Sequence, residues 1–430
     1  MKIRTTLFVF ALFLTALSAQ KRAPAATALT AFAEIFSTRL TALASDTSIT
    51  FEQVQPLFAT LFEQHRRKTR RAVATEASQR YLVIVTLDGF RWQEVFGGAD
   101  SLLLHDPLYT PDTATYRQRY WAATATQRRQ QLLPFIWGAL AAEGQLYGNR
   151  NFGNRVNVAN GLWFSYPGYN ELFTGRPDDA HIFSNLKLPN PNENVLESLQ
   201  RQKGFRNKVV AFSSWDAFPA ILNEKRACIP VYTGPENRNF GTWRATRQHY
   251  QHLKTAFRPT WSEDEYPDAF TRAAAAAHLR NRHPRVAYIA LGDTDQAAHA
   301  GYYDRYLDAA HETDRWLAGL WNFLQNDPTY RGRTTLLLTT DHGRGYREPR
   351  QWRDHNRHIA GADQIWLAAI GPETPQLGEV QQPMQLYQQQ LAQTIARLVG
   401  CTFEPGHAVA PVIVSMFRKM GDFRLTASKN

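Results

Sequence analysis

Acidic and imidazole side chains follow three separate apolar runs of this 430-residue sequence. Asp88 comes directly after YLVIVTL (81–87), Asp295 follows RVAYIAL (285–291) within GDTDQAAH, and Asp341-His342 follows TTLLLTT (334–340). An Asp after one strand is commonly a turn residue or a helix cap. The same residue types after three strands instead predict a shared site.

The types and spacing of these side chains suit metal binding. Asp295 and His299 are four residues apart and share a face if their segment is helical. A further imidazole is needed, and QWRDHNRHIAGADQIW offers His355 and His358. Imidazole nitrogens and carboxylate oxygens hold Zn²⁺ at about 2.0–2.2 Å. Six such groups suit two divalent ions, which about 3.5–4 Å apart can clamp both oxygens of a displacement at phosphorus.

A hydroxyl nucleophile is available in GLWFSYPGYNELFTG, where Ser165 stands just before a proline and a helical pattern. A hydroxyl needs a base or a metal to attack at neutral pH, and the free amides of a helix start assist an anion. A serine in such a turn is usually structural when it stands alone. Its weight comes from the ligands elsewhere in the chain.

The elements that must position these residues alternate between strand and helix. Five apolar runs predict buried parallel strands at 81–87, 207–212, 285–291, 334–340 and 364–370. Residues 196–204 and 303–325 have helical spacing between them. This alternation predicts an open α/β sheet with helices on both faces, and ligands then bind beyond the carboxyl ends of its strands. Residues 100–150 and 215–280 are more irregular and are expected to be insertions or a cap over that edge.

The N-terminus predicts export. Lys2 and Arg4 precede an apolar run at 7–17, and small residues follow, which is typical of a signal peptide over residues 1–20. The run is short of the roughly 20 residues that span a membrane. Residues 21–79 suggest a helical extension with a basic run at 65–71, and we expect a periplasmic or secreted protein without a transmembrane segment.

Composition narrows the classes of function. With 43% hydrophobic residues the chain is globular, and 49 Lys and Arg against 38 Asp and Glu give a net charge of +11. No zinc-finger spacing, recognition helix or RNA-binding aromatic signature accompanies this charge, so we expect no specific nucleic-acid partner, and the charge is better suited to attracting anionic phosphate substrates. Cys228 and Cys401 cannot form a four-cysteine zinc site, and whether they pair stays open.

The order of these motifs resembles the alkaline phosphatase superfamily, especially its nucleotide pyrophosphatase/phosphodiesterase-like branch. The motifs are TLDGF, SYPGYNELFTG, DTDQAAH, TTDHGRG and a late histidine, over about residues 80–400. The resemblance implies a three-layer α/β/α sandwich in residues 80–430 and two zinc ions. One ion would be held by Asp295, His299 and His355, the other by Asp88, Asp341 and His342, with Ser165 bridging to the second. For the late histidine, the number of residues to the following strand favours His355 over His358 as the ligand.

The resemblance also implies a reaction. Ser165 would attack phosphorus to give a phosphoserine, which water then hydrolyses, and Asn185 in RPDDAHIFSN would help hold the phosphoryl oxygen. The substrate would be a phosphodiester or a phosphomonoester. The diester is slightly favoured, because the sequence shows no additional set of basic residues that would bind a doubly charged monoester. The chain departs from the branch in having Ser165 in place of Thr and Gly168-Tyr169 in place of Asn-His, which affects the substrate more than the chemistry.

Other functions compatible with these residues stay open. Sulfatases and phosphonate hydrolases share the fold, but the C/S-x-P-x-R maturation motif is broken because Tyr169 stands where Arg is needed. A non-catalytic protein that binds polyanions through its basic N-terminal segment is the third hypothesis, which the complete set of ligands disfavours. Arg91 and Trp92 after Asp88-Gly89 could contact substrate or have a structural role.

Overall fold

The structure is a computed structural model, and it describes residues 79–234 and 265–418. The predicted signal peptide (1–20) and the predicted helical extension up to residue 78 lie outside the described residues, and so does 235–264 within the second predicted insertion. Among the described residues, none of the helices has both the length and the apolar character that a membrane span requires.

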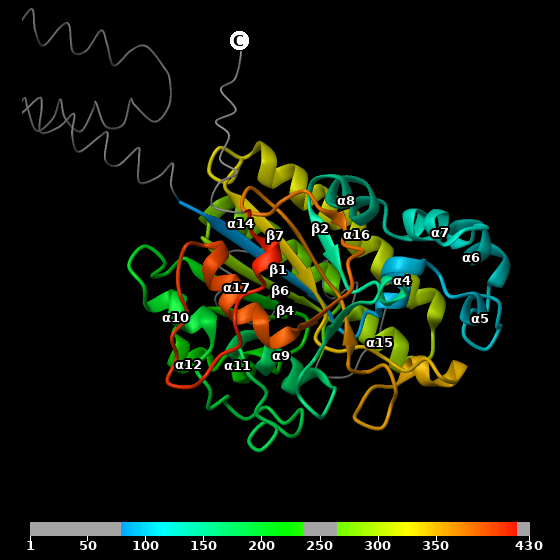
Figure 1. Cartoon of the computed structure of the whole chain (residues 1–430), viewed down its shortest axis with the longest axis horizontal. Coiled ribbons are helices and arrows are strands. Elements are labelled where there is room, and N and C mark those ends of the chain that lie inside the picture. The colour runs from blue at the N-terminus through cyan, green and yellow to red at the C-terminus, as the bar shows by residue number, and fades with distance from the viewer. Residues whose placement is uncertain (1–78, 235–264, 419–430) are drawn as a thin grey trace, which may run out of the picture. The chain divides into compact units, whose positions relative to one another are not determined.

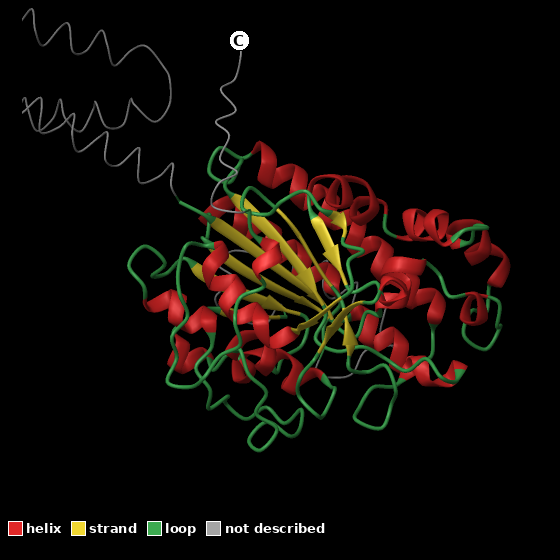
Figure 2. Ribbon diagram, in the orientation of Figure 1, coloured by secondary structure: helices red, strands yellow, loops and turns green. Residues whose placement is uncertain are grey.

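An eight-stranded sheet in the order β10-β2-β9-β7-β1-β6-β4-β5 forms the centre of the domain (Figure 1 and Figure 2). Five neighbouring strands are parallel: β7 (Thr334–Thr339), β1 (Tyr81–Leu87), β6 (Val286–Leu291), β4 (Val209–Ser213) and β5 (Val231–Thr233). β1 lies between β6 and β7, with Val85 opposite both Ile289 and Leu338. These three strands are buried along their whole length, as parallel strands covered on both faces must be.

The predicted parallel strand at 364–370 is wrong in direction. Its second half, β9 (Leu367–Ile370), pairs antiparallel with β7. The reason is the connection: the chain leaves β7 at its carboxyl end, stays at that edge and re-enters the sheet there, whereas a parallel strand needs a crossover to the far edge. β2 (Gln145–Tyr147) and β10 (Gly378–Glu379) complete the large sheet, and β8 (Gln364–Ile365) joins β3 (Asn154–Asn157) and β11 (Met384–Tyr387) in a small one.

Helices cover both faces of the sheet, so the predicted α/β/α sandwich is confirmed (Figure 2). Successive strand residues point to opposite faces, and accordingly Val83 and Val85 join one core while Leu82 and Ile84 join the other. The first core includes residues of α14 (Asp268–Arg282), α15 (Asp293–Ala300) and α16 (Tyr303–Asn326), and the second includes residues of α9 (Ser165–Thr174), α10 (Val195–Arg201), α11 (Phe218–Ile221) and α17 (Leu391–Leu398).

The helix predicted at 303–325 is α16. Its apolar positions Leu307, Leu317 and Leu324 are fully buried, as their helical spacing requires. The irregular segment predicted at 100–150 instead contains several short helices, and these are α5 (Ser101–Leu104), α6 (Thr113–Tyr120), α7 (Ala125–Leu132), η1 (Ile136–Leu140) and α8 (Ala141–Glu143), preceded by α4 (Trp92–Gly97).

The remaining short helices are η2 (Arg150–Phe152), α12 (Glu224–Ala227), η3 (Pro349–Arg353), η4 (Gln388–Gln390) and η5 (Val414–Met416). Cys228 is exposed and Cys401 partly buried, and both are free thiols.

Candidate active site

The carboxyl ends of β1, β6 and β7 bring the acids and imidazoles together. The three strands are adjacent and parallel, so the residues that come after them lie at one edge of the sheet. Asp88 follows β1 directly, Asp341-His342 follows β7, and α15 begins two residues after β6 with Asp295 in its first turn. The sheet order therefore gathers residues that are far apart in the sequence.

One group of side chains centres on His342. Its Nε2 lies 3.3 Å from Ser165 Oγ and 3.4 Å from both Asp88 Oδ1 and Asp341 Oδ2. Four ligands at 2.0–2.1 Å around one tetrahedral Zn²⁺ stand about 3.3 Å apart from each other. The distances from the imidazole nitrogen to the three oxygens match that spacing.

The unpaired atoms in this group also fit a cation. Within the described part of the chain, the buried Asp88 Oδ1 and Asp341 Oδ2 have no hydrogen-bond partner. Buried polar atoms are rarely left in this state unless something else binds them. His342 Nδ1 lies 2.9 Å from the Gly343 carbonyl oxygen, so Nδ1–H donates there and Nε2 faces the carboxylates. Asp88, Asp341 and His342 thus fit a divalent metal ion.

The charges in this group are strongly coupled. Burial alone would lower the pKa of His342, but the carboxylates of Asp341 and Asp88 raise it to about 9. Burial and the neighbouring Asp88 raise the pKa of Asp341 to about 7. The pKa of Asp88 is lowered, because its contacts with His342 outweigh the opposing effect of burial. Without a cation, the protonated imidazole therefore offsets the charge of one of the two carboxylates.

A second group lies beside the first. His299 Nε2 is 3.2 Å from Asp295 Oδ2 and 2.9 Å from His355 Nε2, which again is the spacing of ligands around one ion. The rings of His355 and His342 stack with centroids 3.9 Å apart, and Asp295, His342 and His355 also lie close enough to share an ion. His342 thus stands between the two groups.

His358 differs from His355 in its surroundings. It is exposed in the loop after η3, where its backbone amide donates to Asn356 Oδ1. The structure places His355, rather than His358, beside Asp295 and His299.

Helix α9 begins at Ser165, which projects its hydroxyl toward His342. Trp163, two residues earlier, has φ of +59°, a left-handed conformation that sharpens the turn into the helix. Gly168 lies so close to the segment after β7 that an added Cβ would stand 2.4 Å from the Asp341 carbonyl oxygen. Gly168-Tyr169 stands where the branch has Asn-His, and the glycine of this pair lets α9 approach Asp341.

Asn185 lies next to the start of this helix. Its Oδ1 accepts a hydrogen bond of 3.0 Å from the Tyr166 amide. With Oδ1 occupied by a donor, the two N–H donors of the side chain are the groups that can bind an oxygen elsewhere.

Several side chains that contact the ligands escaped prediction from the sequence. Tyr169 donates to Asp88 Oδ2 at 2.9 Å, and Thr294 Oγ1 donates to the Asp88 carbonyl oxygen at 2.6 Å. Arg344 donates to one carboxylate oxygen of Asp295. The position of Tyr169, four residues after Ser165, was a weak sign that it could reach the site. Arg344, two residues after a metal ligand, gave no such sign, because a cation repels a metal ion and is not expected beside one.

Arg91 and Trp92 have structural partners. Arg91 is buried and forms an ion pair with the buried Glu94, and Trp92 Nε1 donates to Gln364 Oε1 at 2.9 Å. Both side chains tie the loop after β1 to neighbouring segments.

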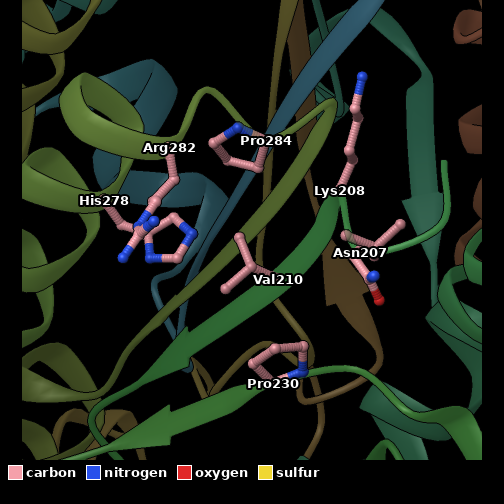
Figure 3. Close-up of a pocket in the computed structure, with 8 residues that line it drawn as sticks. Asn207, Lys208, Val210, Pro230, His278, Arg282 and Pro284 are labelled. Carbon is pink, nitrogen blue, oxygen red and sulfur yellow. The ribbon is translucent and has the colours of Figure 1, made fainter. Parts of the chain in front are cut away.

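A small pocket lies at the opposite edge of the sheet (Figure 3). Its lining comes from residues just before β4, β5 and β6 and from α14, and includes Lys208, Pro230, His278, Arg282 and Pro284. Because the ligand residues follow the carboxyl ends of the strands, this pocket belongs to a different part of the domain.

Comparisons with known proteins bear on the family and the fold of this chain. The family model of type I phosphodiesterase / nucleotide pyrophosphatase matches residues 157–359. The alkaline phosphatase PafA superposes with a TM-score of 0.52 and 12% identity, over 79% of this chain and 99% of that one. The phosphonate monoester hydrolase of Agrobacterium radiobacter superposes with a TM-score of 0.51 and 13% identity, over 80% and 78%. A search of curated proteins found no significant match.

The sequence match and the fold are both similar to those of the alkaline phosphatase superfamily. Within it, the sequence matches the phosphodiesterase and nucleotide pyrophosphatase branch, which indicates a hydrolase of phosphate esters.

Proposed function

We propose that this protein is an exported two-zinc hydrolase of phosphate esters, with Ser165 as nucleophile and diesters as the preferred class. The observation that carries the proposal is the meeting of Ser165 Oγ, His342 Nε2 and two carboxylate oxygens without hydrogen-bond partners at the spacing of ligands around one ion. Export rests on the sequence of residues 1–20 alone.

The residues divide into two sets of ligands. Asp88, Asp341 and His342 would hold one ion with Ser165, and Asp295, His299 and His355 would hold the other. Divalent ions bound there favour the deprotonated hydroxyl and neutralise charge on the phosphoryl oxygens.

Ser165 performs the first displacement. Its Oγ gives its proton to solvent and forms a bond to phosphorus, while the bond from phosphorus to the ester oxygen breaks and the leaving alkoxide takes a proton from water. With a monoester the covalent product is phosphoserine at the start of α9, and with a diester it is a phosphoserine that keeps the second ester group. In the second step a water oxygen attacks phosphorus, the bond from phosphorus to Ser165 Oγ breaks, and the serine hydroxyl is restored.

Asn185 orients the phosphoryl group. Because its Oδ1 accepts from the Tyr166 amide, its N–H donors can bind a phosphoryl oxygen. Neutral donors of this kind suit the single negative charge of a diester. Two arginines of the site loops, Arg344 and Arg353, are engaged with carbonyl or carboxylate oxygens, which favours the diester over the doubly charged monoester.

The test combines metal content with an ester panel. The purified chain should hold about two zinc ions and hydrolyse bis-nitrophenyl phosphate faster than nitrophenyl phosphate, and chelation should abolish both activities until zinc is restored. Ser165→Ala should lose at least about 10³-fold in kcat, as removal of a covalent nucleophile does. Ser198→Ala in α10 is the matched control and should stay within about threefold of the wild type.

The other hypotheses predict different results. A formylglycine sulfatase requires a modified residue 165, so a peptide mass corresponding to unmodified Ser165 excludes it. In this chain Tyr169 stands at the position of the maturation arginine, and its hydroxyl is bonded to Asp88. A non-catalytic polyanion-binding protein would hold no zinc and release no product.

A further inference from the structure

Arg344 is a buried guanidinium in the middle of the site. It lies two residues after His342 in TTDHGRG and is fully shielded from solvent. Its Nε donates to the Gly89 carbonyl at 3.0 Å, and its Nη1 donates to the Arg353 carbonyl at 2.7 Å. Its Nη2 donates both to the backbone carbonyl of Asp295, at 3.4 Å, and to Asp295 Oδ1.

These partners belong to three of the segments that carry ligands. Gly89 follows Asp88, Arg353 precedes His355 by two residues, and Asp295 is itself a ligand. One side chain therefore ties together the segment after β1, the first turn of α15 and the loop after β7.

The neighbouring backbone is shaped around this guanidinium. Gly89 has φ of +56°, and an added Cβ would lie 2.7 Å from Arg344 Nε. A side chain at this position would thus displace the guanidinium. The close approach shows that the turn after β1 accommodates Arg344.

A cation here opposes the simplest electrostatics of a metal site. The guanidinium of an arginine stays charged in proteins, and Arg344 is ion-paired with Asp295. A positive charge beside divalent cations weakens the binding of those cations through space. The position of Arg344 compensates for this repulsion. Arg344 binds Oδ1 of Asp295 and leaves Oδ2, which lies 3.2 Å from His299 Nε2, as the ligand atom.

We propose that Arg344 is a positioning residue for the group Asp295, His299 and His355, which it holds in the geometry that binds one metal ion. The inference rests on the proposed two-zinc function and deepens it. Residues that orient ligands in this way typically contribute 10–100-fold to metal affinity. The larger effect should fall on one ion, because Arg344 hydrogen-bonds a carboxylate oxygen of Asp295 itself, whereas its only hydrogen bond to the segment of Asp88 is to the Gly89 carbonyl.

The experiment measures zinc affinity in the full chain by competition with a chromogenic chelator. Arg344→Lys keeps the charge and loses the planar fork, and Arg344→Gln loses the charge. In both variants we expect one of the two zinc ions to bind about 10–100-fold more weakly and the other to change by less than about threefold. The Co²⁺-loaded variants should show an altered visible absorption for one ion only.

Arg91→Lys is the matched control, because Arg91 is also buried and paired with a carboxylate, Glu94, but contacts no proposed ligand. It should lower the melting temperature and leave both zinc affinities unchanged. Unchanged affinities in both Arg344 variants, or an equal loss of both ions, would overturn the assignment. Loss of a cooperative melt in Arg344→Lys but not in Arg91→Lys would also overturn it, since Arg344 would then be a general folding residue.

The result separates this inference from the proposed function. A wild-type chain that binds no zinc removes both. A chain that binds two zinc ions but keeps full activity in Ser165→Ala removes the proposed nucleophile, and the effect of Arg344 on one ion would still stand.

Discussion

The approach of α9 to Asp341 leads to a test with Gly168→Ala. An added Cβ would stand 2.4 Å from the Asp341 carbonyl oxygen, whereas a carbon–oxygen contact is normally at least about 3.3 Å. Because the oxygen belongs to the backbone and not to a flexible side chain, α9 and the segment after β7 must separate by about 0.9 Å, the difference between the two distances.

This displacement moves Ser165 away from the ligands that follow β7. A misplacement of about 1 Å can cost about 100-fold in rate, so we expect kcat for bis-nitrophenyl phosphate to fall about 100-fold. The loss of stability should be smaller. Overpacking costs about 1–3 kcal/mol, and alanine recovers about 1 kcal/mol as the better helix former, so the free energy of unfolding should fall by at most about 2 kcal/mol.

Gly319→Ala is the matched control. Gly319 also lies inside a helix, α16, but an added Cβ meets nothing within 4 Å. It should gain about 0.5–1 kcal/mol of stability and keep its activity. Urea unfolding and steady-state kinetics measure both quantities. A kcat of Gly168→Ala within about fivefold of the wild type would refute the reasoning that this glycine sets the distance between nucleophile and ligands.

Three further predictions concern single side chains. Tyr169→Phe removes the phenol bonded to Asp88 Oδ2; we expect kcat to fall about 10–100-fold, and the idea fails if kcat is unchanged. Asn185→Asp keeps the acceptor for the Tyr166 amide but loses the N–H donors; kcat/KM for diesters should fall more than about tenfold, and a normal value would exclude Asn185 from binding the phosphoryl group. Burial raises the pKa of Asp314 to about 7, above its ordinary value of about 3.9. Its stabilising contribution is therefore complete below pH 4 and is lost as the pH rises to 7, so Asp314→Asn should gain stability relative to the wild type between pH 5 and pH 8 in urea titrations. A constant difference would contradict this.

Much of the fold was accessible because its signals are local. Continuous apolar runs predict that β1, β6 and β7 are buried. The spacing of the apolar residues in α16 predicts a helix with one buried face. The direction of β9 was not accessible, because an apolar run carries no information about which neighbour it pairs with. The connection around the active edge decides that direction.

The amino-acid sequence alone specifies the ligand types and the strand ends that carry Asp88, Asp295 and Asp341. Which of these groups meet depends on the tertiary structure, because their distances depend on the order of strands in the sheet. The same holds for Tyr169 and Arg344, whose contacts with Asp88 and Asp295 join segments far apart in the chain. The physical reason is that residue chemistry is local, whereas a hydrogen bond or a metal site requires side chains brought together by packing.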